Sequence, residues 1–233
     1  MASYKKSHWE ETEDLIKSRT TLDLMSLAKY FRFPEFSLDI LNGDLAKAEL
    51  DDPVQYANLV SQTKQRDSRD LLTYAKDAIA GWIVEDLTLV EFRKFGFMLR
   101  LNGIDKERKF THSSVITNQA DFILTYNGKE YPAELASTLE DSWIKYDSIW
   151  LRINKLDHLR EQKALLIGTD LYTGKFALVS QFQSGLRYDD YTLFGKAGKR
   201  VFWPNGMHSS EYETTDPAKI KAIIEEHCAG YDR

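Results

Sequence analysis

The clearest pattern along this chain is a pair of short stretches in which apolar and polar residues alternate on either side of Asn127-Gly128. The stretches cover residues 121–126 and 129–134. Asn-Gly favours a two-residue turn in which both residues have positive φ, so alternation on both sides of it predicts a β-hairpin. The turn fixes the register and places Asp121 opposite Glu134 in a non-hydrogen-bonded pair, where the Cα atoms lie about 4.5 Å apart.

Two carboxylates at that distance repel each other unless a positive group joins them. A divalent cation is a natural partner, since Mg²⁺ takes one or two protein carboxylates and leaves positions for phosphate and water. The alternative is that Asp121 and Glu134 lie at a solvated strand end, where their repulsion costs on the order of a few tenths of a kcal/mol. Pro132 allows the pairing if the other side of its strand is an edge, a bulge or a strand end, because proline has no N–H to donate.

Helical spacing of apolar residues characterises the first part of the chain. Residues 1–67 read as an N-terminal helical subdomain that is interrupted at Pro34. The run Asp51-Asp52-Pro53 is typical of a helix start, because proline is favoured at the first helical position.

The next predicted helix is apolar nearly all round, so we expect it to be buried. Asp67 or Ser68 could cap its start, and it runs to about residue 95 before Gly96. Glu85 is an exception on this helix, because an acid among apolar neighbours needs either a partner or a function.

The remaining patterns predict a core of alternating elements over residues 68–180. From residue 69 onward the predicted order is helix, three strands, helix, two strands. Ser137-Thr138, followed by acids three residues on, reads as a capping box that starts a helix continuing to about Gln162. Besides the hairpin, strands are expected at residues 97–101, 114–117, 164–169 and 175–180. Residues 181–233 form the third segment, a C-terminal β-hairpin and helix extension.

Composition bounds the class of protein. With 233 residues, 42% of them hydrophobic, the chain can bury the core of one large domain or of one and a half. No apolar run approaches the roughly 18 residues of a membrane span, and the first residues lack the apolar stretch of a signal peptide. We therefore expect a soluble, cytoplasmic protein without membrane partners. Cys228 is the single cysteine, which excludes a disulfide framework and a cysteine-based zinc site.

Three short motifs occur in order within the predicted core. The first is Gly81-Trp-Ile-Val-Glu-Asp-Leu, followed by Phe95-Gly-Phe; the second is Ala120-Asp121; the third is Glu134-Leu-Ala. Together they resemble the PD-(D/E)XK nuclease superfamily, whose signature places an acid on the first helix, Pro-Asp on the second strand and acid-any-lysine on the third. The resemblance covers about half of the chain.

The resemblance implies an α/β, restriction-endonuclease-like fold, with an αβββαβ core around a mixed central sheet. It implies that Asp121, Glu134 and the carbonyl of Leu135 bind Mg²⁺ or Mn²⁺, and that Glu85 assists directly or through water. The implied activity is metal-dependent hydrolysis of DNA phosphodiester bonds, with RNA as a further possible substrate. Cutting two strands also suggests a homodimer.

Ala136 departs from the family pattern, because it stands where the family has its lysine. In one explanation the lysine has migrated to Lys145, about seven residues into the predicted helix and roughly 10 Å along it, where a long side chain can reach back. Lys129 suits this role less well, since it lies at the turn and on the opposite face from Glu134. In a second explanation the metal alone generates hydroxide. In the third, the domain binds nucleic acid or a protein partner without cleaving.

Basic residues supply candidate nucleic-acid contacts, although the net charge is −5. Arg152 and Lys155 lie with Lys145 on one face of the predicted helix and could follow a phosphate backbone; the alternative is an ordinary solvated face. Residues 191–204 interleave aromatic residues with Lys196, Lys199 and Arg200, as a groove-entering ribbon or a base-stacking platform would. The alternative is that these aromatics belong to the core.

Overall fold

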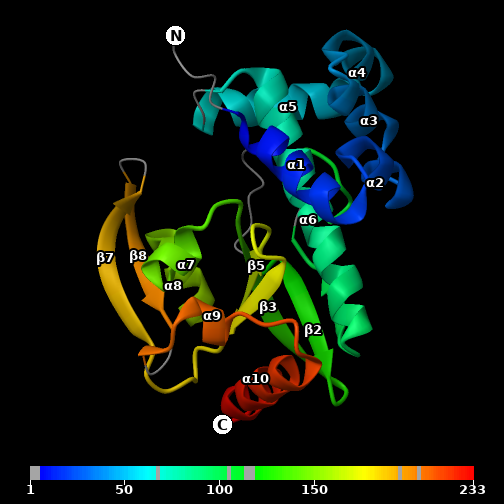
Figure 1. The fold of residues 1–233 in the computed structure, drawn as a ribbon. Helices are drawn as coiled ribbons and strands as arrows, with labels where there is room; N and C mark the ends of the chain where they lie inside the picture. Colours follow the sequence, from blue (N-terminus) through cyan, green and yellow to red (C-terminus); the bar gives the residue numbers. More distant parts are fainter. Residues whose placement is uncertain (1–5, 67–68, 104–105, 113–118, 194–195, 204–205) are drawn as a thin grey trace. The chain divides into compact units, whose positions relative to one another are not determined.

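The chain folds into two compact units with a mixed α/β composition (Figure 1). Unit 1 comprises Met1–Thr88 and Gly103–Thr117, and unit 2 comprises Leu89–Asn102 and Asn118–Arg233. The computed structural model describes the following residues: 6–66, 69–103, 106–112, 119–193, 196–203 and 206–233. The three-segment division at residues 67/68 and 180/181 stays a prediction.

Unit 1 contains the helices that its sequence pattern predicts, and two of them begin with polar caps. The side chains of Asp23 and Asp44 accept hydrogen bonds from the first turns of α2 and α4. Pro34 caps α3, and α5 begins at Pro53, so both proline signals are confirmed. The helices are α1 (His8–Thr20), α2 (Leu24–Tyr30), α3 (Glu35–Asn42), α4 (Leu45–Asp51) and α5 (Pro53–Arg66).

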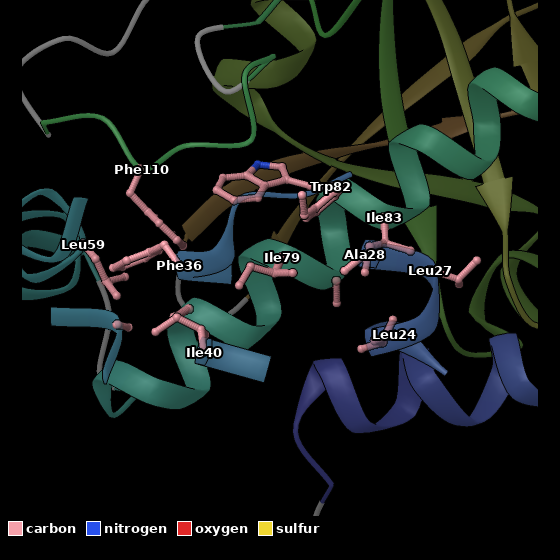
Figure 2. Close-up of a cluster of buried hydrophobic side chains, with 14 of the residues drawn as sticks. Leu24, Leu27, Ala28, Phe36, Ile40, Leu59, Ile79, Trp82, Ile83 and Phe110 are labelled. Carbon is pink, nitrogen blue, oxygen red and sulfur yellow. The ribbon is translucent and has the colours of Figure 1, made fainter. Parts of the chain in front are cut away.

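The core of unit 1 forms around helix α6 (Leu71–Lys94), whose residues up to Thr88 belong to this unit. Figure 2 shows Ile79, Trp82 and Ile83 of α6 among buried side chains from α2, α3 and α5. The side chain of Asp70 accepts the Thr73 N–H at 2.8 Å and so caps the start of α6. The caps predicted at residues 67 and 68 lie outside the described residues, whereas the predicted end of the helix before Gly96 is confirmed.

Unit 2 contains a five-stranded mixed sheet in the order β1-β2-β3-β5-β6. The β2–β3 hairpin has the predicted register, with Tyr126 paired to Lys129 and Phe122 to Ala133. Asn127 and Gly128 have φ angles of 50° and 77°, as a type I′ turn requires. The strands are β1 (Met98–Leu101), β2 (Phe122–Tyr126), β3 (Lys129–Thr138), β5 (Leu165–Asp170) and β6 (Lys175–Val179).

The pairing directions follow from the connections between the strands. β3 and β5 are parallel, and the other neighbouring pairs are antiparallel. The β3–β5 ladder begins at Ala133, so Pro132 lies just beyond its end, where its missing N–H is tolerated. The strand predicted at residues 114–117 lies outside the described residues.

The single helix predicted from residues 137–138 to 162 is wrong, because the connection from β3 to β5 is divided into three elements. This connection contains α7 (Ser142–Tyr146), strand β4 (Ser148–Arg152) and α8 (Ile153–Glu161). Asp147 ends α7 with a φ of 45°, a left-handed conformation that Asp tolerates better than most residues. The apolar spacing fits a helix, but pairing of β4 with the distant strand β8 (Lys196–Phe202) outweighs it.

β4 belongs to a second sheet of three strands in the order β4-β8-β7, where β7 is Arg187–Leu193. Figure 1 shows α7 and α8 against one side of this sheet. Side chains of Ile149, Leu156 and Val201 pack together there in a second buried cluster. Helices α9 (Ser209–Tyr212) and α10 (Pro217–Tyr231) complete the unit. None of the helices in the described residues combines the length and apolar composition needed to cross a bilayer.

Candidate functional site

Asp121 and Glu134 lie at the open end of the β2–β3 hairpin, where the sequence predicts them. Asp121 directly precedes β2, and Glu134 lies within β3, next to the last ladder pair. The Asp121 Oδ2 atom accepts a hydrogen bond from the backbone N–H of Leu135 at 2.8 Å. This contact ties the first acid to the strand that carries the second, so the hairpin holds the two acids together.

Helix α8 brings a lysine and a histidine to these acids. The Lys155 Nζ lies 3.2 Å from Asp121 Oδ2 and 3.0 Å from Glu134 Oε2, and the His158 Nδ1 lies 3.1 Å from Glu134 Oε1. Residues three apart on a helix share a face. Leu156 and Leu159 are fully buried and anchor α8 in the core of unit 2, so this short helix presents Lys155 and His158 from a fixed position.

Electrostatics divide the two acids into different roles. Burial raises the pKa of Glu134 to about 7; the Lys155 ammonium opposes this effect, and the charge of Asp121 adds to it. Burial also acts to raise the pKa of Asp121, but Lys155 and the Leu135 N–H outweigh it, so that pKa lies below its ordinary value. Burial acts to lower the pKa of Lys155, whereas the two carboxylates raise it above its ordinary value. At neutral pH the cluster therefore holds an ionised Asp121, a charged Lys155 and a Glu134 close to its midpoint.

The surroundings of Ala136 are apolar. Ala136 lies on the same face of β3 as Glu134, two residues away, and packs against the apolar cluster that contains Trp143. Its ladder partner is Gly168, where an added Cβ would lie 2.9 Å from the Trp143 ring. A lysine at position 136 would begin with its aliphatic stem in these apolar surroundings, and its ammonium group would have to extend beyond them to remain solvated or paired. Lys155 approaches the acids from the helix instead.

Of the other predicted catalytic residues, Lys145 is not part of this cluster, and Glu85 belongs to the other unit. Lys145 is exposed on α7, with its Nζ 5.4 Å from the centroid of the Tyr146 ring. Glu85 belongs to unit 1, where its Oε2 pairs with Arg108 Nη1 at 2.5 Å. Arg108 also pairs with Asp86 at 2.8 Å. Glu85 therefore has the partner that an acid on a buried helix needs, and its metal-supporting role stays a prediction.

The predicted nucleic-acid contacts are divided between different parts of unit 2. Lys155 belongs to the acid cluster, where sequence reasoning had given it only a backbone-contact role. Arg152 and Arg200 lie on one face of the three-stranded sheet, and Lys199 lies on the other face, paired with Asp190. Lys196 is the first residue of β8. Their binding of nucleic acid stays a prediction.

His158 is the one member of the cluster that sequence reasoning missed. Its other ring nitrogen, Nε2, lies 2.8 Å from Gln162 Nε2, one turn along α8. An amide nitrogen only donates, so Nε2 accepts and the proton of His158 sits on Nδ1, facing Glu134. The available signal was the spacing of 155, 158 and 162, which places these three residues on one face of any helix that contains them.

The donor set suits a hard divalent ion with few protein ligands. Among the described residues, no group of three or more His, Cys, Asp or Glu side chains is arranged to hold a metal ion. Mg²⁺, however, is commonly held by one or two carboxylates together with water and phosphate oxygens. Asp121 and Glu134 supply that number of carboxylates, so the residues present fit Mg²⁺ or Mn²⁺, and they do not form an all-protein cage.

Comparison with known protein families finds no family model that matches the chain, and comparison with curated proteins finds no match either.

Proposed function

We propose that this protein is a metal-dependent nuclease that hydrolyses phosphodiester bonds in DNA. The observation that carries the proposal is that Lys155 Nζ lies within 3.2 Å of both Asp121 and Glu134. Two acids, one directly before β2 and one within β3, together with one lysine are the set that the PD-(D/E)XK resemblance requires, and here the lysine comes from a helix.

The order of elements in unit 2 supports the same proposal. Three antiparallel strands, β1 to β3, are followed by a connection that contains helices and then by β5, parallel to β3. This order agrees with the restriction-endonuclease-like core that the resemblance implies, in which both acids lie on the second and third strands. We include the fold family in the proposal on that basis.

Each residue of the cluster has a role in the proposed reaction. Asp121 and Glu134 would hold Mg²⁺ or Mn²⁺, with the Leu135 carbonyl as a further ligand. The bound ion would supply positive charge that favours hydroxide over water and stabilises the phosphate as charge develops on it. Lys155 is placed to orient the attacking water and to face that developing charge. His158 donates to Glu134 and fixes the orientation of its carboxylate.

A second candidate function is a module that keeps this fold and binds nucleic acid or a protein partner without cleaving. The observation that favours it is the direct pairing of Lys155 with both acids. An ammonium group between two carboxylates balances their charge, so the cluster is stable without an ion and can have a purely structural role.

The test combines cleavage with metal binding. Wild-type protein is incubated with supercoiled, linear and single-stranded DNA, and with RNA, in Mg²⁺ or Mn²⁺ and in EDTA. The variants are Asp121→Asn, Glu134→Gln and Lys155→Met, and Lys145→Met is the matched control, a lysine outside the cluster. We expect metal-dependent cleavage that falls about 100-fold or more in the three cluster variants and is unchanged in the control.

Calorimetric titration with Mn²⁺ separates the two candidate functions. A nuclease should bind Mn²⁺ through Asp121 and Glu134 and lose that binding in Asp121→Asn. If the wild type neither binds the ion nor cleaves any of these substrates, the nuclease proposal is wrong and the non-cleaving module is favoured. Equal cleavage by the wild type and Asp121→Asn would also refute the proposal, because the activity would then come from elsewhere.

A further inference from the structure

The two faces of the three-stranded sheet differ in chemistry. Residues paired directly across an antiparallel ladder share a face, so the registers β4–β8 and β8–β7 assign each side chain. One face carries Ile149, Leu151, Val201 and Tyr188 and packs on the core with α8. The opposite face, called the outer face below, carries Trp150, Arg152, Arg187, Asp189, Arg200 and Phe202.

The outer face is positively charged within a chain whose net charge is −5. Three of its side chains are arginines, and one is an acid. Arg152, Arg187 and Asp189 are exposed, and Trp150 and Phe202 are partly exposed. A solvated sheet face normally carries mixed polar side chains. Aromatic rings interleaved with arginines instead match the chemistry of nucleic acid, which offers flat bases and negative phosphates.

The arginines on this face are held in place by the rings. The guanidinium carbon of Arg200 lies 4.8 Å from the ring centroid of Trp150 and 5.3 Å from that of Tyr146, and the two rings lie 5.1 Å apart. The guanidinium carbon of Arg187 lies 4.2 Å from the centroid of Phe202. An arginine stacked on a ring has its planar guanidinium held in place, so it loses less entropy when it binds a ligand, and bases stack on guanidinium planes as well as on rings.

A cavity of about 440 Å³ opens at the edge of the outer face. Tyr146, Arg187, Phe202 and Met207 are among its lining residues. This volume lies within the range of small-molecule sites and accommodates one nucleoside. The cavity therefore places a site for a single unpaired base next to a stacked arginine.

We propose that the outer face of the three-stranded sheet is a binding site for single-stranded nucleic acid, whose bases stack on Tyr146, Trp150 and Phe202 while the arginines contact phosphates. In a duplex the bases stack on one another, so their faces are closed to protein rings. The site consequently favours single strands over duplexes. This inference deepens the proposed nuclease function by naming a substrate class, yet binding at this face does not require the acid cluster.

Fluorescence anisotropy with labelled oligo-deoxythymidine, oligo-uridine and a duplex of matched length tests the inference on the full chain. Measurements in EDTA exclude cleavage. The variants are Trp150→Leu, Arg187→Met and Arg200→Met. The matched control is Arg160→Met, because Arg160 also stacks on a ring, at 4.4 Å from the Tyr188 centroid, away from the outer face.

We expect the wild type to bind both single strands more tightly than the duplex. Trp150→Leu should weaken single-strand binding about 5-fold to 100-fold, as loss of one stacking platform does. Each arginine variant should weaken it and lower its salt dependence, and Arg160→Met should bind like the wild type. Circular dichroism melting checks that each variant is folded; for any that is not, Tyr146→Ala replaces it, since that ring is exposed at the edge of the face.

Three results would overturn the inference: no single-strand binding by the wild type, folded outer-face variants that bind like the wild type, or equal affinity for duplex and single strands. The Asp121→Asn variant distinguishes failure of this inference from failure of the nuclease proposal. If Asp121→Asn binds single strands as tightly as the wild type does, and the wild type does not cleave, only the nuclease proposal fails. If cleavage occurs without binding at the outer face, only this inference fails.

Discussion

Glu213 and Asp170 form a second buried acid pair, and it predicts how stability changes with pH. The Oδ1 atom of Asp170 accepts N–H bonds from Tyr172 and Thr173, and Glu213 Oε2 accepts the Thr173 hydroxyl at 3.1 Å. Among the described residues, no donor reaches Asp170 Oδ2 or Glu213 Oε1, and both atoms are buried. A proton on Glu213 provides the missing donor between the two acids.

The pKa of Glu213 gives the size of the effect. Burial raises it from 4.5 to about 7, and the neighbouring charge of Asp170 acts in the same direction. Because the folded-state pKa is the higher one, protonated Glu213 stabilises the fold below pH 4.5, and this contribution is lost as the pH rises to about 7. At 1.36 kcal/mol per pKa unit, the loss amounts to about 3 kcal/mol.

Glu213→Gln tests this prediction, because glutamine keeps the shape and donates a hydrogen bond at every pH. Urea unfolding at a series of pH values should give equal stabilities for the wild type and Glu213→Gln at pH 4. The variant should become the more stable protein by about 3 kcal/mol above pH 7. The matched control is Glu211→Gln, which changes an exposed acid two residues away and should show no such divergence. A stability difference that stays constant from pH 4 to pH 8 would refute the reasoning.

Three further changes have effects that the structure determines. Arg108→Leu leaves two carboxylates of α6 without their common partner and should lower the free energy of unfolding by about 3–5 kcal/mol. The control Arg100→Leu removes an exposed ion pair and should change this free energy by less than about 1 kcal/mol. Similar urea midpoints for the two variants would contradict the prediction. Gly168→Ala places a Cβ 2.9 Å from both the Ala177 carbonyl oxygen and the Trp143 ring, and should cost about 1–3 kcal/mol in thermal unfolding. An unchanged melting temperature would contradict this prediction. Gly128→Ala forces a φ of 77° on alanine and should lower the free energy of unfolding by about 1–2 kcal/mol. Hydrogen exchange should show faster opening of the hairpin in this variant, and an unchanged exchange rate would contradict the prediction.

The parts of the fold that were predictable from sequence are those set by neighbouring residues. The Asn127-Gly128 turn determines its own conformation, and the alternation beside it sets the register that brings Asp121 and Glu134 together. The start of α5 at Pro53 is another local effect, because the fixed φ of proline suits a first helical turn.

The region from 142 to 161 was not predictable in this way. Its apolar residues have helical spacing, yet Ser148–Arg152 forms a strand because β8, about 50 residues later, supplies the pairing edge. The error carried over to the site. Once β4 is read as part of a helix, Lys155 falls on a solvated face, and Lys145 becomes the nearer lysine. The spacing of His158 from Lys155 and Gln162 indicates only a shared helix face, because its contact with Glu134 joins residues that are distant in the sequence.

Lys155 is the residue on which both candidate functions depend. Its ammonium group satisfies the two acids in the way that a structural ion pair would, and the same position lies beside any phosphate bound at those acids. A divalent ion at Asp121 and Glu134 would repel this ammonium, so ion binding would weaken the contacts of 3.0 and 3.2 Å and free the lysine to face the phosphate.

Replacement of Lys155 by methionine therefore has opposite effects on metal binding and on cleavage in a nuclease. Mn²⁺ affinity rises because the competing charge is gone, and cleavage falls because the charge facing the phosphate is gone. In a purely structural cluster, the same replacement leaves two repelling carboxylates and only reduces stability. The direction of these changes, more than the presence of the acids, distinguishes a catalytic lysine from a structural one.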